Sequence, residues 1–315
     1  MAKSKKPSLK ATLSSAQARL KKKKQAEDAT LQALNHRAKG VSRKGMAKTQ
    51  IPQRSAIPFD PSDHILLIGE GDFSFASALL QRPPAPLEHL PPANIIATAY
   101  DTEDECYAKY TDAEQNVRVL REKGTRVIFS VDATRLEKTS ALKGKVFDRI
   151  AWNFPHAGKG ITDQDRNVLS NQVLILGFLR SAAKFLVRGP VPQLQSSRKR
   201  KRLSDDDGDE LTDEGDNQIV GVSGRRRRGT VLITLRNVPP YTEWDVPKLA
   251  KNPPPPRSSV EPPNPHYILF RSFGFDRNDW NGYKHRMTKG ERARGQGKTG
   301  EGGEDRTWEF FLKNE

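Results

Sequence analysis

The chain contains only one cysteine and no long apolar run, and these two shortages exclude several classes of protein. Cys106 can form no internal disulfide and supports no cysteine-based zinc site, which suits a reducing compartment. The six histidines lack the spacing of metal ligands, so we expect no metal site. The longest apolar run, VLILGFL at residues 173–179, is too short to cross a bilayer. No apolar stretch follows the first basic residues, so we expect neither a membrane association nor a secretory signal.

Acidic side chains are scarce only at the start of the chain. Residues 1–54 hold 15 Lys or Arg side chains against two acids, Glu27 and Asp28, so they carry +13 of the net charge of +16. Residues 190–229 hold nine basic and eight acidic side chains, and the rest of the chain holds 30 and 28. The strongly basic character therefore belongs to an N-terminal arm.

This arm, residues 1–58, has almost no large apolar side chains that could offset the entropy lost on ordering. We expect it to be disordered when free, like the low-complexity insertion at 190–229. A polybasic segment attracts the phosphate backbone of nucleic acids. RNA contacts are therefore predicted at Lys21, Lys22, Lys23 and Lys24. This run and SSRKRKR at 196–202 also look like nuclear import signals, and a solubilising or localisation tail is an equally open reading.

From residue 59 to residue 315 the pattern alternates between apolar β-rich runs and helical stretches, which predicts one α/β domain with a mostly parallel sheet and helices on both faces. Strands are expected within residues 64–69, 94–101, 126–134, 147–156, 230–237, 266–275 and 306–314. Helices are expected within residues 72–81, 102–124, 167–189 and 242–251.

Four strand ends carry unusual residues: GEGDFSF after the first strand, Asp101 after the second, Asp132 after the third and NFPH after the fourth. Ligands of open α/β sheets bind outside the carboxyl ends of the strands, near the point where strand order reverses. The four ends therefore predict one binding site. Its expected cofactor contacts are Gly69, Glu70, Gly71, Asp72, Phe73, Ser74, Asp101, Asp132 and Ala133.

The composition of the glycine turn, residues 69–74, indicates what it binds. A dinucleotide-binding turn would read G-x-G-x-x-G, but Ser74 stands in place of the third glycine. Glu70 and Asp72 would repel a pyrophosphate, and the Gly-Lys-Ser/Thr sequence of a P-loop is missing. A cationic ligand such as S-adenosylmethionine fits better. The alternative is that Asp72 merely caps the following helix.

The next two strand ends have similar alternatives. Asp101 can accept hydrogen bonds from both ribose hydroxyls, or it can cap a helix together with Asp104. Asp132 suits the adenine amino group, or it belongs to a simple turn. The three positions together favour the cofactor.

The fourth strand end is expected to carry the chemistry. NFPH stands where enzymes that methylate planar nitrogens have an Asn-Pro-Pro-aromatic motif. Asn153 can hydrogen-bond a base edge, Phe154 can stack or pack, and Pro155 stiffens the turn. His156 can accept a proton or orient a base, although many loop histidines are only hydrogen-bonded residues.

Several segments resemble, in order, the eukaryotic 25S ribosomal RNA (uridine-N(3))-methyltransferase family. They are ILLIGEGDFSFASAL, NIIATAYDTEDE, FDRIAWNFPHAGKGI, NQVLILGFLRSA, VLITLRNVPPYTEWDVPKLA and GYKHRMT, and the match runs from about residue 60 to 290 outside the insertion. The resemblance implies a Rossmann-like class I methyltransferase fold, S-adenosyl-L-methionine as cofactor, and N(3) of one uridine in large-subunit RNA as target. It also implies a nucleolar enzyme acting on ribosomal RNA or a pre-ribosomal particle, and we expect a monomer.

The implied target constrains the chemistry. The imide nitrogen of uracil lies on the Watson–Crick edge, so the base must be unpaired or rotated out of a helix. Candidates to stack on it are Phe154, Tyr241, Trp244 and Tyr283, of which Trp244 better suits the core. His285 and Arg286, in YKHRMT, are predicted to contact RNA phosphate, and a solvated basic segment is an equally open reading.

Two other functions stay open at this point. A non-catalytic, RNA-binding ribosome-assembly factor could retain the same fold, although all four strand-end elements are intact. An NAD-dependent reductase is opposed by the acidic turn and by Ser74.

Overall fold

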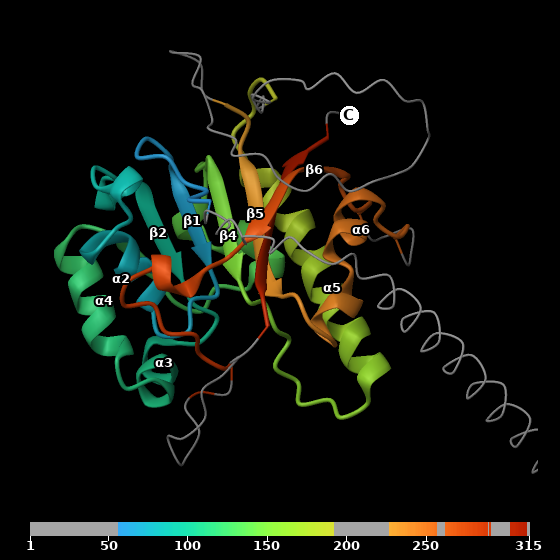
Figure 1. Cartoon of the computed structure of the whole chain (residues 1–315), viewed down its shortest axis with the longest axis horizontal. Helices are drawn as coiled ribbons and strands as arrows, with labels where there is room; N and C mark the ends of the chain where they lie inside the picture. The colour runs from blue at the N-terminus through green and yellow to red at the C-terminus, as the bar shows by residue number, and fades with distance from the viewer. Residues whose placement is uncertain (1–55, 192–226, 257–261, 289, 291–302, 314–315) are drawn as a thin grey trace, which may run out of the picture. The chain divides into compact units, whose positions relative to one another are not determined.

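A seven-stranded sheet forms the centre of the computed structural model, which describes residues 56–191, 227–256, 262–288, 290 and 303–313. The strand order is β3-β2-β1-β4-β5-β7-β6 (Figure 1). Neighbouring strands are parallel, except that β7 is antiparallel to both β5 and β6. The strands are β1 (Ile65–Ile68), β2 (Ile95–Thr98), β3 (Arg126–Ile128), β4 (Arg149–Asn153), β5 (Thr230–Arg236), β6 (Tyr267–Gly274) and β7 (Asp305–Leu312). The predicted α/β fold with a mostly parallel sheet is confirmed.

β1 shows why the central strands read as continuous apolar runs. All four of its residues are buried, but they alternate between the two faces of the sheet. Leu66 and Ile68 belong to one hydrophobic cluster, and Ile65 and Leu67 belong to the other. Both faces are covered, so neither set of side chains can be polar.

Helices cover both faces of the sheet (Figure 1). α2 (Ser74–Gln81), α3 (Glu103–Lys109) and α4 (Ala113–Glu122) contribute to the cluster that contains Ile65. α5 (Gln164–Ala182) and α6 (Val246–Lys251) contribute to the cluster that contains Leu66.

The boundaries of several predicted elements were wrong. The helix expected at 102–124 is interrupted, because Tyr110 has an extended backbone between α3 and α4. α5 ends at Ala182, before a 3-10 turn, rather than at Gly189. β3 stops at Ile128, shortly before Ser130, which adopts a positive φ of 56°. The hydrogen bonds of these ends decide the boundaries, and residue periodicity does not report them.

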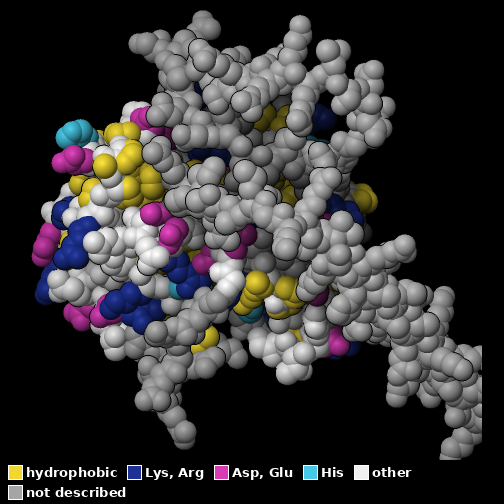
Figure 2. Space-filling view, viewed as in Figure 1, with side chains coloured by type: hydrophobic (Ala, Val, Ile, Leu, Met, Phe, Trp, Pro, Cys, Tyr) yellow, Lys and Arg dark blue, Asp and Glu magenta, His cyan; other side chains and the backbone are white. Residues whose placement is uncertain are grey.

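Residues Gln53–Glu315 cluster as one compact unit. The predicted arm at 1–58 lies almost entirely outside the described residues, and so does most of the insertion at 190–229. On the face shown in Figure 2, basic and acidic side chains are interspersed where α3 and α4 lie, in line with the near balance of charge outside the arm. Among the described helices, none is long and apolar enough to cross a membrane.

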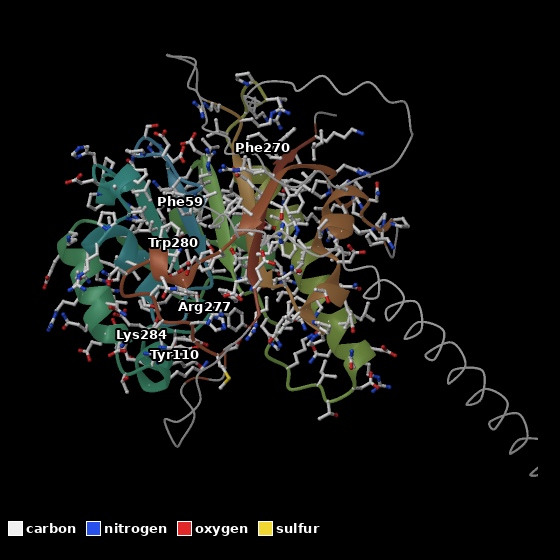
Figure 3. The ribbon with its side chains drawn as sticks, in the orientation of Figure 1. Phe59, Tyr110, Phe270, Arg277, Trp280 and Lys284 are labelled. Atoms are coloured by element: carbon white, nitrogen blue, oxygen red, sulfur yellow. The ribbon has the colours of Figure 1, made fainter. Side chains whose placement is uncertain are left out.

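An aromatic cluster fastens the segment after β6 to the first helix. The Phe75 ring in α2 lies 4.9 Å from Trp280, 5.6 Å from Tyr283 and 6.2 Å from Phe275, measured between centroids. Phe59 completes the group at 6.0 Å from Trp280 (Figure 3). This packing holds residues 275–283 beside the carboxyl ends of the strands.

We expect Phe75→Ala to lower the free energy of unfolding by about 3–5 kcal/mol, because it removes the ring at the centre of this cluster. The measurement is urea denaturation followed by circular dichroism. Phe270→Ala is the control, since Phe270 is half-buried and lies apart from the Phe75 cluster, edge-on to Phe311 and beside the Arg271 guanidinium. An equal loss in both variants would contradict the central role of Phe75.

Candidate active site

The glycine turn follows β1 at the carboxyl edge of the sheet. Gly69 has a φ of +63°, and a Cβ there would lie 2.7 Å from Nε1 of Trp152. Both constraints require glycine. The backbone at this position is exposed, so a ligand can approach it closely.

The two carboxyl groups of the turn point at the start of α2. Glu70 accepts a hydrogen bond from the Ala76 N–H at 3.1 Å, and Asp72 accepts one from the Ser74 N–H at 3.0 Å. Burial raises the pKa of Glu70 from 4.5 to about 8, so its carboxyl is mostly protonated at neutral pH. Asp72 thus binds the first N–H of α2 although Phe73 is the N-cap residue, and contact with a cofactor stays a prediction for both carboxyl groups.

Asp72 also meets a cation of the chain itself. Its Oδ2 lies 2.6 Å from Nε of Arg286, and the same guanidinium reaches Asp112 with Nη2 at 2.8 Å. Arg286 belongs to a segment at residues 283–288, here called the strap, that crosses the glycine turn. In this structure the cation that meets Asp72 is Arg286 of the same chain, and binding of a cationic ligand by the turn stays a prediction.

Backbone and side-chain hydrogen bonds fix the strap over the turn. Lys284 exchanges two hydrogen bonds with Ser74, at 3.0 and 3.2 Å, and its Nζ pairs with Asp112 at 2.6 Å. The Tyr110 hydroxyl donates to the Met287 carbonyl at 2.9 Å. Lys284 and Tyr110 lie close together at the lower edge in Figure 3. The break between α3 and α4 thus places Tyr110 against the strap.

Asp101 and Asp132 lie at the next two strand ends. The Asp101 backbone carbonyl accepts from Ser130, which brings the loops after β2 and β3 together. Oδ1 of Asp101 lies 2.5 Å from Nζ of Lys109, and its side chain is 19% exposed. Asp132 accepts from both the N–H and the hydroxyl of Thr134 and so caps the turn that begins with buried Ala133. The structure brings both positions to the expected edge.

NFPH lies between the glycine turn and β5. Asn153 ends β4, and Phe154 takes a positive φ of 53° while its N–H donates to the Thr234 carbonyl at 2.8 Å. Pro155 is buried. Nδ1 of His156 accepts from the Gly158 N–H at 2.9 Å. The structure therefore presents Asn153 and Phe154 together at the site.

The aromatic candidates for base stacking have different surroundings. Trp244 is 1% exposed and belongs to the core, in agreement with the preferred reading of its sequence position. Its ring lies 5.8 Å from His156 and 5.2 Å from Tyr241. Tyr283 belongs to the aromatic cluster around Phe75. Phe154 is half-buried, and it lies directly at the strand end.

The surroundings of Phe154 contain residues that the sequence analysis did not identify. Its ring lies 4.2 Å from the His285 ring, and the Arg277 guanidinium lies 5.2 Å from the ring centre. Arg277 pairs with Asp305 at 2.6 Å, and Arg236 approaches the same carboxylate at 4.0 Å. Arg236 ends β5 and Asp305 begins β7. The sequence signal that could have found this region is Arg236, the polar residue at the end of the fifth predicted strand.

His285 is half-buried, and its ring lies close to Phe154. Burial, together with the guanidinium groups of Arg277 and Arg236, lowers the pKa of His285 from 6.5 to about 3. The ring is therefore neutral at physiological pH. Its predicted contact with RNA would have to use hydrogen bonding or stacking rather than charge.

Two further expectations concern the basic arm and a metal site. Lys21, Lys22, Lys23 and Lys24 lie outside the described residues, so their RNA contacts stay predictions. Within the described part of the chain, no group of three His, Cys, Asp or Glu side chains is arranged to hold a metal ion.

The motifs at this edge of the sheet lie within a segment that matches a known protein family. A family model described as rRNA (uridine-N3-)-methyltransferase, BMT5-like, matches residues 66–287, which include the glycine turn, both strand-end carboxylates, NFPH and nearly all of the strap. The chain belongs to this methyltransferase family. The resemblance noted from the motifs is confirmed.

The chain is also similar to individual known proteins. The chain is 27% identical over 269 residues to the 25S rRNA (uridine(2634)-N(3))-methyltransferase of Saccharomyces cerevisiae, covering 77% of this chain and 71% of the yeast protein. It is 25% identical to heavy metal-associated isoprenylated plant protein 41 of Arabidopsis thaliana, of which it spans 35%. A 16S rRNA (adenine(1408)-N(1))-methyltransferase structure from Catenulisporales acidiphilia matches with a TM-score of 0.33 and 11% identity, over 81% of this chain and 94% of that one.

The raised pKa of Glu70 predicts a pH dependence of stability. Between pH 4.5 and about pH 8 the folded protein holds one proton more than the unfolded chain. The stabilisation of the fold by the protonated Glu70 carboxyl is complete below pH 4.5 and is lost as the pH rises through 8.

We expect Glu70→Gln to remove this decline, because the amide oxygen still accepts from Ala76 but does not ionise. Chemical denaturation from about pH 5 to about pH 9 should show the variant gaining stability relative to the unmodified protein as the pH rises. The same substitution at the exposed Glu88 is the control. Parallel stability curves for Glu70→Gln and the unmodified protein would contradict the assignment.

Proposed function

We propose that the protein uses S-adenosyl-L-methionine to methylate N(3) of one uridine in large-subunit, 25S-type ribosomal RNA. We further propose that it acts in the nucleolus, as a monomer, on ribosomal RNA or a pre-ribosomal particle. The observation that supports this most is the meeting of the glycine turn, Asp101 and the Asn153–Phe154 corner at one edge of the sheet. The switch in strand order between β1 and β4 lies at the same place.

The residues of the first three strand ends fit the cofactor. The Gly69 turn leaves backbone exposed where a side chain would collide with Trp152. Asp101 uses Oδ1 for Lys109, and no hydrogen bond to its Oδ2 is seen within the described residues, so that oxygen can accept from a ribose hydroxyl. Asp132 and Ala133 stand at the neighbouring strand end for the adenine. When bound, S-adenosylmethionine supplies a methyl group on an already reactive sulfonium, which leaves the protein mainly the task of alignment.

The fourth strand end fits a nucleobase. The Asn153 amide is half-buried, and the described residues offer it no hydrogen bond. An amide has both donors and acceptors, so it can bind a uracil carbonyl and orient the imide. The ring of Phe154 beside it provides an apolar surface for the base. His285 is a poor candidate for the proton acceptor, because its low pKa reflects a weak affinity for protons.

The activity predicts one missing modification in cells without the gene. Nucleoside analysis of their large-subunit RNA should show the loss of one N(3)-methyluridine, restored by the intact gene. Restoration should fail with Asp101→Ala, and His156→Ala tests whether His156 is also required. An unchanged RNA profile in the deletion would reject the proposed function.

The cofactor assignment predicts a selective loss of affinity. We expect Asp101→Asn to weaken S-adenosylmethionine binding by about 10- to 100-fold in calorimetry, because a hydrogen bond to a charged acceptor contributes about 1.5–3 kcal/mol. Asp104→Asn, three residues away and exposed, should bind normally.

Calorimetry also distinguishes the alternative function. Absence of any binding to the unmodified protein would favour a non-catalytic RNA-binding assembly factor with the same fold.

A further inference from the structure

The loop between NFPH and α5, residues 157–162, carries a lysine between two glycines; we call it the GKG loop. In Figure 1 the chain between β4 and α5 extends beyond the lower ends of the central strands. Gly158 and Gly160 adopt φ values of +65° and +64°, a region that favours glycine. Lys159 between them is exposed, at the same edge of the sheet as the candidate site.

Two asparagines of α5 fix the GKG loop at both ends. Oδ1 of Asn171 accepts the Ala157 N–H at 2.8 Å, and its Nδ2 donates to Oδ1 of Asn167 at 2.7 Å. Nδ2 of Asn167 donates to the Ile161 carbonyl at 3.1 Å. Asn171 is 1% exposed, so its amide is committed to these bonds rather than to solvent. The tip of the loop is therefore presented on a firm support.

The tip of the GKG loop carries hydrogen-bond donors that have no partner within the described part of the chain. They are the Lys159 ammonium and the backbone N–H groups of Lys159, Gly160 and Ile161. The next acid in the sequence, Asp163, accepts the Arg166 N–H at 2.9 Å and caps α5. An ammonium beside successive peptide N–H groups suits an anion with several acceptor oxygens, such as a phosphate.

The strap relates the position of the GKG loop to that of Phe154. The His285 ring lies 4.2 Å from the Phe154 ring. Further along the strap, Cγ2 of Thr288 lies 3.0 Å from where a Cβ of Gly158 would stand. The backbone from His285 to Thr288 spans at most roughly 10 Å. The loop thus contacts the strap close to the surface proposed for the base.

We propose that the GKG loop binds a backbone phosphate of the RNA beside the target uridine, with Lys159 as the cation, and so positions that nucleotide for methyl transfer. The proposal rests on the proposed function. Phosphate contacts fix the register of a nucleic acid without reading its sequence. A uridine rotated out of its helix has lost its pairing and stacking, so a contact to the phosphate holds it in place while the base lies beside Phe154.

The chemistry of the two reactants favours RNA as the ligand of this loop. S-adenosylmethionine carries no phosphate, and its single carboxylate is expected at the exposed backbone of the glycine turn. The ammonium of Lys159 lies on the surface, where a macromolecule can reach it. Positioning at this point contributes to the rate because methyl transfer depends mainly on alignment.

The test is the salt dependence of methyl transfer. Values of kcat/KM are measured between about 50 and about 200 mM salt, with S-adenosylmethionine and large-subunit RNA from cells that lack the gene. The enzymes are the unmodified full chain, Lys159→Gln, Lys159→Arg and the control Lys143→Gln. Lys143 is also exposed, but it precedes β4 and so lies toward the opposite edge of the sheet.

We expect Lys159→Gln to lower kcat/KM about 10-fold at about 50 mM salt and only about fourfold at about 200 mM, because one phosphate contact on a single strand changes the slope of log(kcat/KM) against log(salt) by about 0.7. Lys159→Arg should keep most of the rate and the slope, since a guanidinium also binds phosphate. Lys143→Gln should match the unmodified protein in both quantities.

Calorimetry with S-adenosylmethionine shows whether the fold and the donor site are intact in the variant. Lys159→Gln should bind the donor as tightly as the unmodified protein does. A clear loss of donor affinity would assign the loop to the carboxylate of S-adenosylmethionine and would overturn the inference.

The kinetic results separate this inference from the function on which it rests. A loss in Lys159→Gln that is equal at every salt concentration, or no larger than the loss in Lys143→Gln, would overturn the phosphate contact and leave the proposed function intact. An unmodified protein that forms no methyluridine from this RNA would overturn the proposed function as well.

Discussion

The carboxylate of Asp72 connects more of this site than any other single group. It is buried, accepts the Ser74 N–H at the start of α2, and pairs with Arg286 on the strap. The strap in turn places the His285 ring against Phe154. A buried charge is costly unless it is paired and hydrogen-bonded, so the turn, the helix start and the strap have to be in place together. One ion pair thereby couples the first strand end to the fourth.

The carboxyl edge of the sheet divides its charged groups on either side of β4. The carboxylates of Asp101 and Asp132 follow β2 and β3, while Arg236 ends β5 and Arg277 follows β6. Burial keeps the Glu70 carboxyl after β1 mostly protonated near neutral pH, so it adds little negative charge. The two carboxylates suit the positively charged methyl donor of the proposed reaction, and NFPH lies between them and the arginines.

Sequence patterns predicted much of this edge because parallel strands place their carboxyl ends together. An apolar run identifies a strand, and the first polar residue after it identifies a position at the edge. Asp101, Asp132 and Asn153 were found in this way. Arg236 obeys the same rule, but it belongs to none of the motifs associated with methyl transfer. Arg277 and Asp305 gave no such signal, because their importance comes from a pairing across 28 residues of chain.

Partners that are distant in sequence account for the other differences. The glycine turn was predicted to bind a cationic ligand, but Arg286, 214 residues further on, is the cation that meets Asp72 in the structure. The interruption at Tyr110 was missed because residues 102–124 have a helical pattern throughout, while the hydroxyl of Tyr110 bonds the strap. His285 and Arg286 read as exposed basic residues, whereas packing makes one neutral and commits the other to two carboxylates.

The sequence by itself determined the α/β class, the strand ends that meet at one edge of the sheet, and the family. Those features depend on local composition and on the short-range periodicity of buried elements, which are visible without coordinates. Only the tertiary structure decided which charges face one another, because pKa values and ion pairs depend on distance and burial. The pairing of Asp72 with Arg286, and the approach of His285 and Arg277 to the Phe154 ring, arise where β1, β4, β5 and the strap meet in space.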